Sequence, residues 1–194
     1  MKVYKATNKD MICTMGAGAF QYEIGKTYTA EDCKCGRTGL HSCEYILDCM
    51  GYYPMYGENR FFVAEAGGDM HEVGGEDTRV ASTELTLIKS LDPLHICYEA
   101  MQYMIQHPGR RWTKAVPNVR ASENYVEVGG TGWIGIARGY EPEFTAKAGA
   151  VIGLLHEEGE EIAMARVCIV LPERAGRRYK LTAGGDIVPA GGAG

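Results

Sequence analysis

The stretch NYVEVGGTGWIGIARG, residues 124–139, decides how the C-terminal half of the chain folds. It contains two adjacent eight-residue units, and glycines close both of them. Val126 and Val128 of the first unit correspond to Ile134 and Ile136 of the second, so apolar residues alternate along both. Short strands with glycines at a fixed interval predict stacked rungs, as in a β-roll or a small β-solenoid. A plain β-meander explains the same pattern.

The segments that follow this stretch also predict short strands. EFTAKAGAVIGLL shows the same alternation of apolar residues less strictly, and HEEGEE after it predicts a hairpin turn. Three further strands are predicted in EIAMARVCIVL, RRYKLTA and DIVPA. We therefore expect residues 118–194 to form a β-rich C-terminal part.

Before this part, residues 92–117 carry the clearest helix signal in the chain, followed by a linker. Asp92 suits an N-cap and Pro93 suits the first helical turn. His107, Pro108 and Gly109 end the pattern. A methionine-rich apolar stripe runs along it, which favours a packing seam over a cofactor site. The stripe consists of Leu94, Cys97, Met101, Met104 and Ile105.

Residues 1–91 are expected to form a compact head that combines strands with one helix. Strands are predicted at residues 2–7, in FQYEI, in RFFVAEA and in RVASTELTLIKSL. Between them, Cys43, Ile46, Leu47 and Met50 lie at helical spacing, and Gly51 follows the last turn. The chain as a whole is thus predicted to be α+β and rich in strands.

Composition narrows the classes of function. The 194 residues carry a net charge of −5, which argues against a direct nucleic-acid partner because phosphate binding needs a concentrated basic face. Met1 is followed by a strand pattern and no apolar run, so we expect no signal peptide and no membrane association. Seven cysteines, an odd number, favour a reducing cytoplasm over a disulfide framework.

A cysteine cluster in CKCGRTGLHSC, residues 33–43, is the candidate metal site. Its ligands for zinc would be Cys33, Cys35, His41 and Cys43, with Cys13 as a replacement for one of the first two. The C-x-C spacing differs from the C-x2-C and C-x4-C pairs of usual structural sites, so the chain needs a turn there for both sulfurs to converge. Buried, reduced cysteines are the first alternative to zinc. A catalytic Cys–His pair is the second.

The N-terminal region resembles a family of phage and prophage proteins of unknown function. The residues that carry the resemblance are YKATNKDMICT, FQYEIGKTY, GLHSCEYILDCMGYYP and RFFVAEAGG, and it covers about residues 2–91. Members often continue with glycine-rich tandem repeats, which residues 122–149 would represent in shortened form. The resemblance implies a mobile-element origin and a cytoplasmic life in an infected bacterium. It also implies that Cys13, Cys35, His41 and Cys43 belong to the family pattern, from which Cys33 departs.

Three functions compete at this point. The first is a phage accessory protein that binds a protein of the host or the phage, for example to inhibit a defence complex. Exposed aromatic residues would form its interface, because tyrosine and tryptophan give rigid contact area with a polar tip. The candidates are Tyr52, Tyr53, Tyr56 and Phe61, which lie in the segment GYYPMYGENRFF, and Trp133. A core loop capped by aromatics is the other interpretation of that segment.

The second function is an enzyme similar to ADP-ribosyltransferases that uses NAD. Glu65 would supply the acidic residue, and Tyr28 or Tyr53 the stacking ring. The histidine or arginine expected on the first strand is replaced by Lys5 and Thr7. The third function is a structural particle or fibre protein, which the repeat-like stretch suggests and which leaves an oligomer open.

Overall fold

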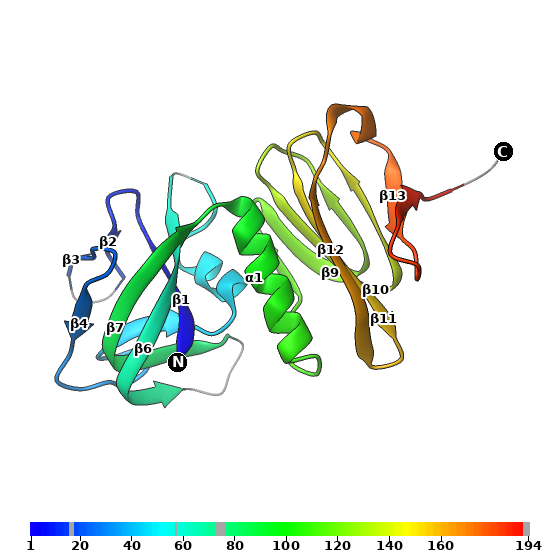
Figure 1. The fold of residues 1–194 in the computed structure, drawn as a ribbon. Coiled ribbons are helices and arrows are strands. Elements are labelled where there is room, and N and C mark those ends of the chain that lie inside the picture. The colour runs from blue at the N-terminus through cyan, green and yellow to red at the C-terminus, as the bar shows by residue number, and fades with distance from the viewer. Residues whose placement is uncertain (16–17, 57, 73–76, 192–194) are drawn as a thin grey trace. The chain divides into compact units, whose positions relative to one another are not determined.

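The computed structural model describes residues 1–15, 18–56, 58–72 and 77–191 (Figure 1). The chain divides into two compact units, Met1–Asp92 and Pro93–Gly194. The boundary lies one residue from the end of the expected head. The predicted linking helix belongs to the C-terminal unit and is no separate segment. Strands dominate both units, so the prediction of a β-rich protein is confirmed.

The N-terminal unit is built from seven strands and one short helix in its described residues. They are β1 (Lys2–Thr7), β2 (Ile12–Cys13), β3 (Phe20–Gln21), β4 (Thr27–Thr29), β5 (Leu40–Cys43), the 3-10 helix η1 (Ile46–Gly51), β6 (Arg60–Glu72) and β7 (Arg79–Leu91). The helix predicted over residues 43–50 is thus a 3-10 helix that begins at Ile46. Cys43, the first residue of the predicted stripe, ends a strand instead.

The main strands of this unit pair in a closed cycle. β1 pairs with β6, β6 with β7 and β7 with β5, and β5 returns to β1 through Tyr4 and Cys43. All four pairings are antiparallel. β7 serves two neighbours at once, because residues 79–82 pair with β5 while residues 80–91 pair with β6. A closed cycle leaves few unpaired backbone groups at an edge.

η1 is tied to the start of β7 by a buried carboxylate. Asp48 is buried, and its Oδ2 accepts hydrogen bonds from the Thr78 N–H at 2.9 Å and the Thr78 hydroxyl at 2.8 Å. The Thr78 hydroxyl oxygen also accepts from the Tyr45 N–H at 2.8 Å. A buried carboxylate is stable only when such donors surround it. These bonds hold the short helix over the cycle of strands.

The C-terminal unit consists of one α-helix, seven strands and one 3-10 turn in its described residues. They are α1 (Pro93–Gln106), β8 (Lys114–Val116), β9 (Val119–Val128), β10 (Ile134–Ala146), β11 (Val151–Glu158), β12 (Glu161–Ile169), η2 (Pro172–Arg174), β13 (Arg178–Leu181) and β14 (Ile187–Pro189). Neither α1 nor the short helical segments of the described residues are long and apolar enough to cross a membrane.

Three consecutive strands of this unit lie parallel. β10 pairs in parallel with β9 on one side and with β11 on the other, so that Ile134 is opposite both Val119 and Val151. A meander pairs consecutive strands antiparallel, so this segment is no meander. The correspondence of the eight-residue units is wrong in register, because Val126 lies opposite Phe144 and not opposite Ile134. One predicted eight-residue unit is therefore shorter than one strand together with its return to the next strand.

The pairing of β9 with β10 shifts register at a corner. Asn124 alone separates the two paired segments of β9, whereas residues 139–142 separate those of β10. Asn124 has φ 58°, in the left-handed region that asparagine tolerates. A Cβ on Gly139 would lie 2.0 Å from the Asn124 Oδ1, so only glycine fits against that amide. The corner is thus fixed by two residues that the sequence places fifteen positions apart.

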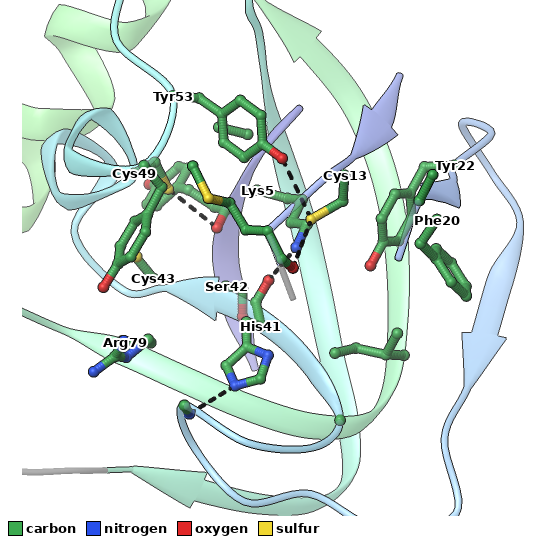
Figure 2. Close-up of a pocket in the computed structure, with 18 of the residues that line it drawn as sticks. Lys5, Cys13, Phe20, Tyr22, His41, Ser42, Cys43, Cys49, Tyr53 and Arg79 are labelled. Atoms are coloured by element: carbon green, nitrogen blue, oxygen red, sulfur yellow. Dashed lines mark hydrogen bonds between the residues drawn. The ribbon is translucent and has the colours of Figure 1, made fainter. Parts of the chain in front are cut away.

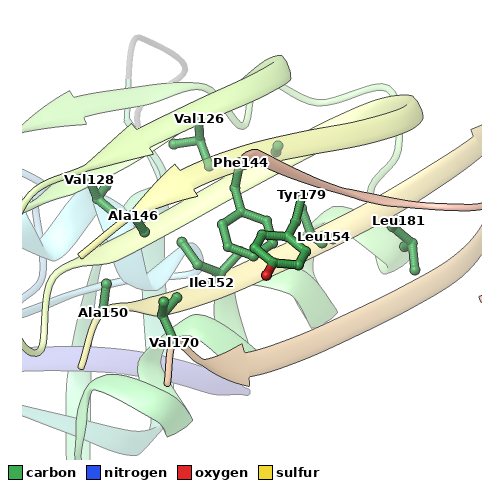
Figure 3. Close-up of a cluster of buried hydrophobic side chains, with 11 residues drawn as sticks. Val126, Val128, Phe144, Ala146, Ala150, Ile152, Leu154, Val170, Tyr179 and Leu181 are labelled. Carbon is green, nitrogen blue, oxygen red and sulfur yellow. The ribbon is translucent and has the colours of Figure 1, made fainter. Parts of the chain in front are cut away.

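Inside the bend lies an apolar core (Figure 3). Phe144 and Tyr179 stack at its centre, with ring centroids 5.7 Å apart. Gly135 faces the same core, where a Cβ would meet Ile152 and Val126 at about 3.1–3.2 Å. The buried residues of this core are Val126, Val128, Ala137, Phe144, Ala146, Ala150, Ile152, Leu154, Val170, Tyr179 and Leu181.

α1 covers the opposite side of β11. Cys97, Met101 and Met104 of the predicted stripe are buried and form a packing seam, whereas Leu94 is half-buried and Ile105 is 38% exposed. The closest approach is at Gly153, where a Cβ would lie 2.6 Å from the Met101 Sδ and 2.9 Å from the Cys97 Sγ. The glycine is needed because the helix packs directly on the strand backbone.

We predict that Gly153→Ala lowers the free energy of unfolding of the C-terminal unit by about 1–3 kcal/mol, because the added methyl overpacks this seam. Both tryptophans, Trp112 and Trp133, lie in this unit, so urea unfolding followed by tryptophan fluorescence measures it directly. The matched control is Gly184→Ala, since the nearest neighbour to a Cβ there is the Thr182 Oγ1 at 3.7 Å. Equal stability of the two variants would contradict the described packing.

A pocket built around a buried lysine

A pocket with a volume of about 480 Å³ opens in the N-terminal unit (Figure 2). This volume is in the range of sites for small molecules. β1, β5, η1, the start of β7 and the segment from β2 to β3 contribute to its wall. The side chains that give it chemical character are Lys5, Cys13, Arg37, His41, Ser42, Cys43, Cys49, Tyr52, Tyr53 and Arg79. No aspartate or glutamate is among the described residues that line it.

Lys5 is the central charge of this pocket. It lies on β1 with only 6% of its surface exposed, and its Nζ donates a hydrogen bond to the His41 carbonyl at 2.6 Å. The same Nζ is 5.3 Å from the centroid of the Tyr22 ring. Within the described residues no carboxylate forms an ion pair with Lys5. A buried ammonium without a counter-charge is costly, so the pocket has a net attraction for an anion.

Cys13, at the end of β2, is the group that responds most to this charge. Burial raises the pKa of its thiol, but the Lys5 ammonium and a hydrogen bond from Tyr53 outweigh this effect and bring the pKa below the ordinary value. The Tyr53 hydroxyl donates to the Cys13 Sγ at 3.5 Å, while its oxygen accepts from the Thr14 N–H at 2.7 Å. The neighbours of Cys13 therefore more than offset the effect of burial on the pKa of its thiol.

An aromatic cluster stands on the β3 side of the pocket. The ring centroids of Phe20, Tyr22 and Tyr28 lie 4.9–5.2 Å from one another in tilted and edge-on contacts. Tyr22 is buried, whereas Phe20 is 40% exposed. Burial, and then the negative charge that Cys13 can carry, raise the pKa of Tyr22, so its phenol stays neutral. Phe20 and Tyr22 line the pocket and offer flat apolar surface there.

His41 and Ser42, neighbours on β5, complete the polar wall. The His41 Nε2 accepts a hydrogen bond from the Gly36 N–H at 2.8 Å, which fixes the loop before β5. Burial, together with the positive charges of Lys5 and Arg79, lowers the pKa of His41, so the ring is neutral at pH 7. Ser42 is 4% exposed, and within the described residues its Oγ has no hydrogen-bond partner. A buried hydroxyl without a partner is available to a ligand.

The predicted metal ligands do not come together in this structure. The Cys33 thiol donates to the Asp69 carbonyl at 3.2 Å, and the Cys35 thiol to the Arg79 carbonyl at 3.5 Å. Cys13 contacts Tyr53, His41 contacts Gly36, and Cys43 interacts with Cys49. Among the residues described, no group of three or more histidine, cysteine, aspartate or glutamate side chains could hold a metal ion. The zinc hypothesis therefore gains no support.

All seven cysteines are free, and five of them are buried. This is the arrangement that the alternative of buried, reduced thiols describes. The physical reason is the local geometry: residues 34–38 form a tight turn in which the Lys34 N–H bonds the Thr38 carbonyl at 3.1 Å. That turn sends the sulfurs of Cys33 and Cys35 to different backbone carbonyls, where a metal would need them to converge.

The aromatic residues predicted for an interface have three different environments. Tyr53 and Phe61 are 7% and 3% exposed: one ring lines the pocket and the other lies in the core. Tyr52 is partly buried and donates to Asp77. Tyr56 is 56% exposed, and Trp133 in the C-terminal unit is 37% exposed.

The residues predicted for NAD chemistry are not gathered either. Tyr53 lines the pocket, but Glu65 is exposed on β6 and Tyr28 lies outside the lining. The residues that do make the site, above all Lys5, Ser42, Cys49 and Arg79, were not among the predicted site residues. The sequence carries a signal for Lys5 alone, because a lysine in the middle of a predicted strand is unusual where that strand is buried.

Comparison with known protein families gives one match. Residues 1–108 match the family described as a domain of unknown function, DUF7666. The chain belongs to this family. The match contains the whole pocket of the DUF7666 domain and extends through α1. Searches of curated proteins and of solved structures gave no match.

The neutral His41 ring makes the stability of the DUF7666 domain depend on pH. Its pKa is lower in the folded state than in the unfolded state, where it is about 6.5, so the unfolded state binds the proton more readily. The contribution of His41 to the free energy of unfolding is fully present above the pKa of the unfolded state. It is lost as the pH falls from that pKa to the pKa of the folded state. We predict that His41→Gln reduces the loss of stability between about pH 7 and about pH 5. Urea unfolding followed by near-UV circular dichroism at both pH values measures this, and an unchanged loss in the variant would contradict it.

Proposed function

We propose that the N-terminal unit is a binding module for a small anionic ligand that carries a planar group, the chemical class to which nucleotides belong. The observation that supports this proposal most directly is Lys5: an ammonium that is 6% exposed, lines a pocket and has no carboxylate counter-charge among the described residues. An anionic ligand would supply that counter-charge.

The charges around Lys5 support an anion of more than minimal size. Arg37 and Arg79 also line the pocket, although the chain as a whole carries −5. Arginine binds phosphate and carboxylate groups with its planar fork of donors. The Ser42 Oγ adds a neutral donor without a competing partner in the described residues. Phosphate, phosphonate and carboxylate groups all fit this donor set.

The aromatic wall supports a planar group on the same ligand. Phe20 and Tyr22 line the pocket with apolar ring surface, and Phe20 remains 40% exposed. Stacking on such rings contributes about 1–3 kcal/mol per base in nucleic-acid binding proteins. Cationic side chains combined with an aromatic wall therefore favour a nucleotide over inorganic phosphate alone.

The resemblance to phage and prophage proteins supports a setting for this activity. In that setting the chain is a phage accessory protein in the cytoplasm of an infected bacterium, and it binds a host metabolite. The parallel stacking of β9, β10 and β11 supports a β-roll in the C-terminal unit, as in the tandem repeats of that family.

Calorimetric titration with adenosine 5′-monophosphate tests the proposal. We predict that the wild-type chain binds it more tightly than either adenosine or inorganic phosphate, because both halves of the pocket are then used. Lys5→Met should weaken binding at least about tenfold, since a hydrogen bond to a charged group contributes about 1.5–3 kcal/mol.

The matched control is Lys9→Met, which removes an equal charge from a side chain that is 61% exposed and lies outside the pocket. It should bind as the wild type does. Circular dichroism establishes that Lys5→Met is folded. No binding of any of the three probes, or equal loss in the two lysine variants, would overturn the proposal.

A protein partner is the second candidate, and the exposure of Tyr56 favours it. In this case Tyr56→Ala should abolish co-purification of one defined protein from the bacterial host, because a buried tyrosine anchor commonly contributes more than about 1 kcal/mol. Tyr98→Ala, at a residue 49% exposed in the C-terminal unit, is the control. A partner retained by both variants would exclude Tyr56 as its contact.

A further inference from the structure

We propose that Cys13 is a nucleophilic thiol that forms a covalent bond with small electrophiles carrying a negative charge. The inference rests on the same pocket as the proposed ligand, but it assigns a reaction to one atom of its wall. The sulfur lines the pocket, accepts a hydrogen bond from the Tyr53 hydroxyl at 3.5 Å and lies within reach of the Lys5 ammonium.

These two neighbours give the sulfur the environment of a reactive cysteine. A thiolate is the nucleophilic form, and it is favoured where a cation and hydrogen-bond donors surround it. Lys5 is the cation, held in place by its bond to the His41 carbonyl. Tyr53 is the donor, and its orientation is fixed because its oxygen accepts from the Thr14 N–H. Neither neighbour depends on the presence of a ligand.

An independent observation points to the charge of the reaction partner. Ser42 lines the same pocket, is 4% exposed, and has an Oγ without a hydrogen-bond partner in the described part of the chain. Together with the Lys5 ammonium it would receive a carboxylate or a phosphate. An electrophile with such a group would therefore be concentrated next to the sulfur of Cys13.

Five of the other thiols lack this environment, whereas Cys35 interacts with Arg79 and donates to its carbonyl at 3.5 Å. Burial raises the pKa of Cys97 and of Cys168, and burial with the neighbouring Asp69 and Asp32 carboxylates raises that of Cys33. Cys43 interacts with Cys49, whose thiol donates to the Tyr4 carbonyl at 3.4 Å. Cys13 is the described thiol whose neighbours lower its pKa.

The reaction is a nucleophilic displacement. With iodoacetate, the thiolate sulfur forms a bond to carbon, the carbon–iodine bond breaks, and iodide leaves with the electron pair. With a small disulfide that carries carboxylates, the sulfur bonds one sulfur of the reagent, and the other leaves as a thiolate. In that case Cys13 is oxidised to a mixed disulfide and half of the reagent is reduced, so no further oxidant is needed.

The test compares iodoacetate with neutral iodoacetamide on the full chain, with the rate of modification at each cysteine followed by peptide mass spectrometry. Cys33, on the same unit but beside carboxylates, is the internal reference. We expect the ratio of the iodoacetate rate to the iodoacetamide rate to be about tenfold higher at Cys13 than at Cys33, because the nearby cation attracts the charged reagent. Lys5→Met should remove this difference, and Lys9→Met should retain it.

A ratio at Cys13 equal to that at Cys33, or modification of Cys33 and Cys168 while Cys13 stays unmodified, would overturn the proposal. Urea unfolding followed by near-UV circular dichroism shows whether the N-terminal unit of each variant is folded. If Lys5→Met unfolds this unit, Tyr53→Phe replaces it: this variant keeps the ring, removes the donor, and should slow both reagents at Cys13 several-fold. An unchanged rate in that variant also contradicts the proposal.

The outcome is separable from that of the nucleotide titration. Charge-selective alkylation without nucleotide binding would leave Cys13 as the reactive group and exclude the planar ligand. Nucleotide binding with a slow, unselective Cys13 would refute only the covalent reaction.

Discussion

The charge of Lys5, held almost out of contact with water, is the constraint on which the N-terminal unit depends. The ammonium needs acceptors and polarisable surface, and the fold supplies them from distant parts of the chain. β5 provides the His41 carbonyl, the segment from β2 to β3 provides the sulfur of Cys13 and the ring of Tyr22, and η1 leads to Tyr53. The closed pairing of β1, β6, β7 and β5 brings these segments around one side chain.

Much of the fold followed from the sequence because its signals were local. The alternation over residues 79–91 and the periodic stripe behind Asp92 correspond to β7 and α1. Each of these elements is set by neighbouring residues alone, by a period of two or of 3.6 and by a cap. The register of the parallel strands was not predictable in the same way. It depends on the corner at residues 139–142, where β10 carries more residues than β9 does around Asn124.

Only part of the candidate site was predictable from the sequence. Five of the predicted site residues line the pocket: Cys13, His41, Cys43, Tyr52 and Tyr53. The role first given to the cysteines was metal binding, because sequence spacing cannot show that the turn at residues 34–38 directs neighbouring sulfurs to separate carbonyls. Lys5 on β1 and Arg79 on β7 line the same pocket, and hydrophobic periodicity does not reveal such a long-range relation.

The parallel stacking in the C-terminal unit has a consequence for how such chains change length over evolution. β10 offers one edge to β9 and the other to β11 in the same register, and each return to the next strand is a short glycine-containing segment. A duplicated copy of one strand and its return would find the same partners above and below it. The antiparallel pairing of β12 with β11 ends this series. Adding or removing such a layer between β9 and β12 leaves the residues that line the N-terminal pocket unaltered, because the pocket lies in the other unit.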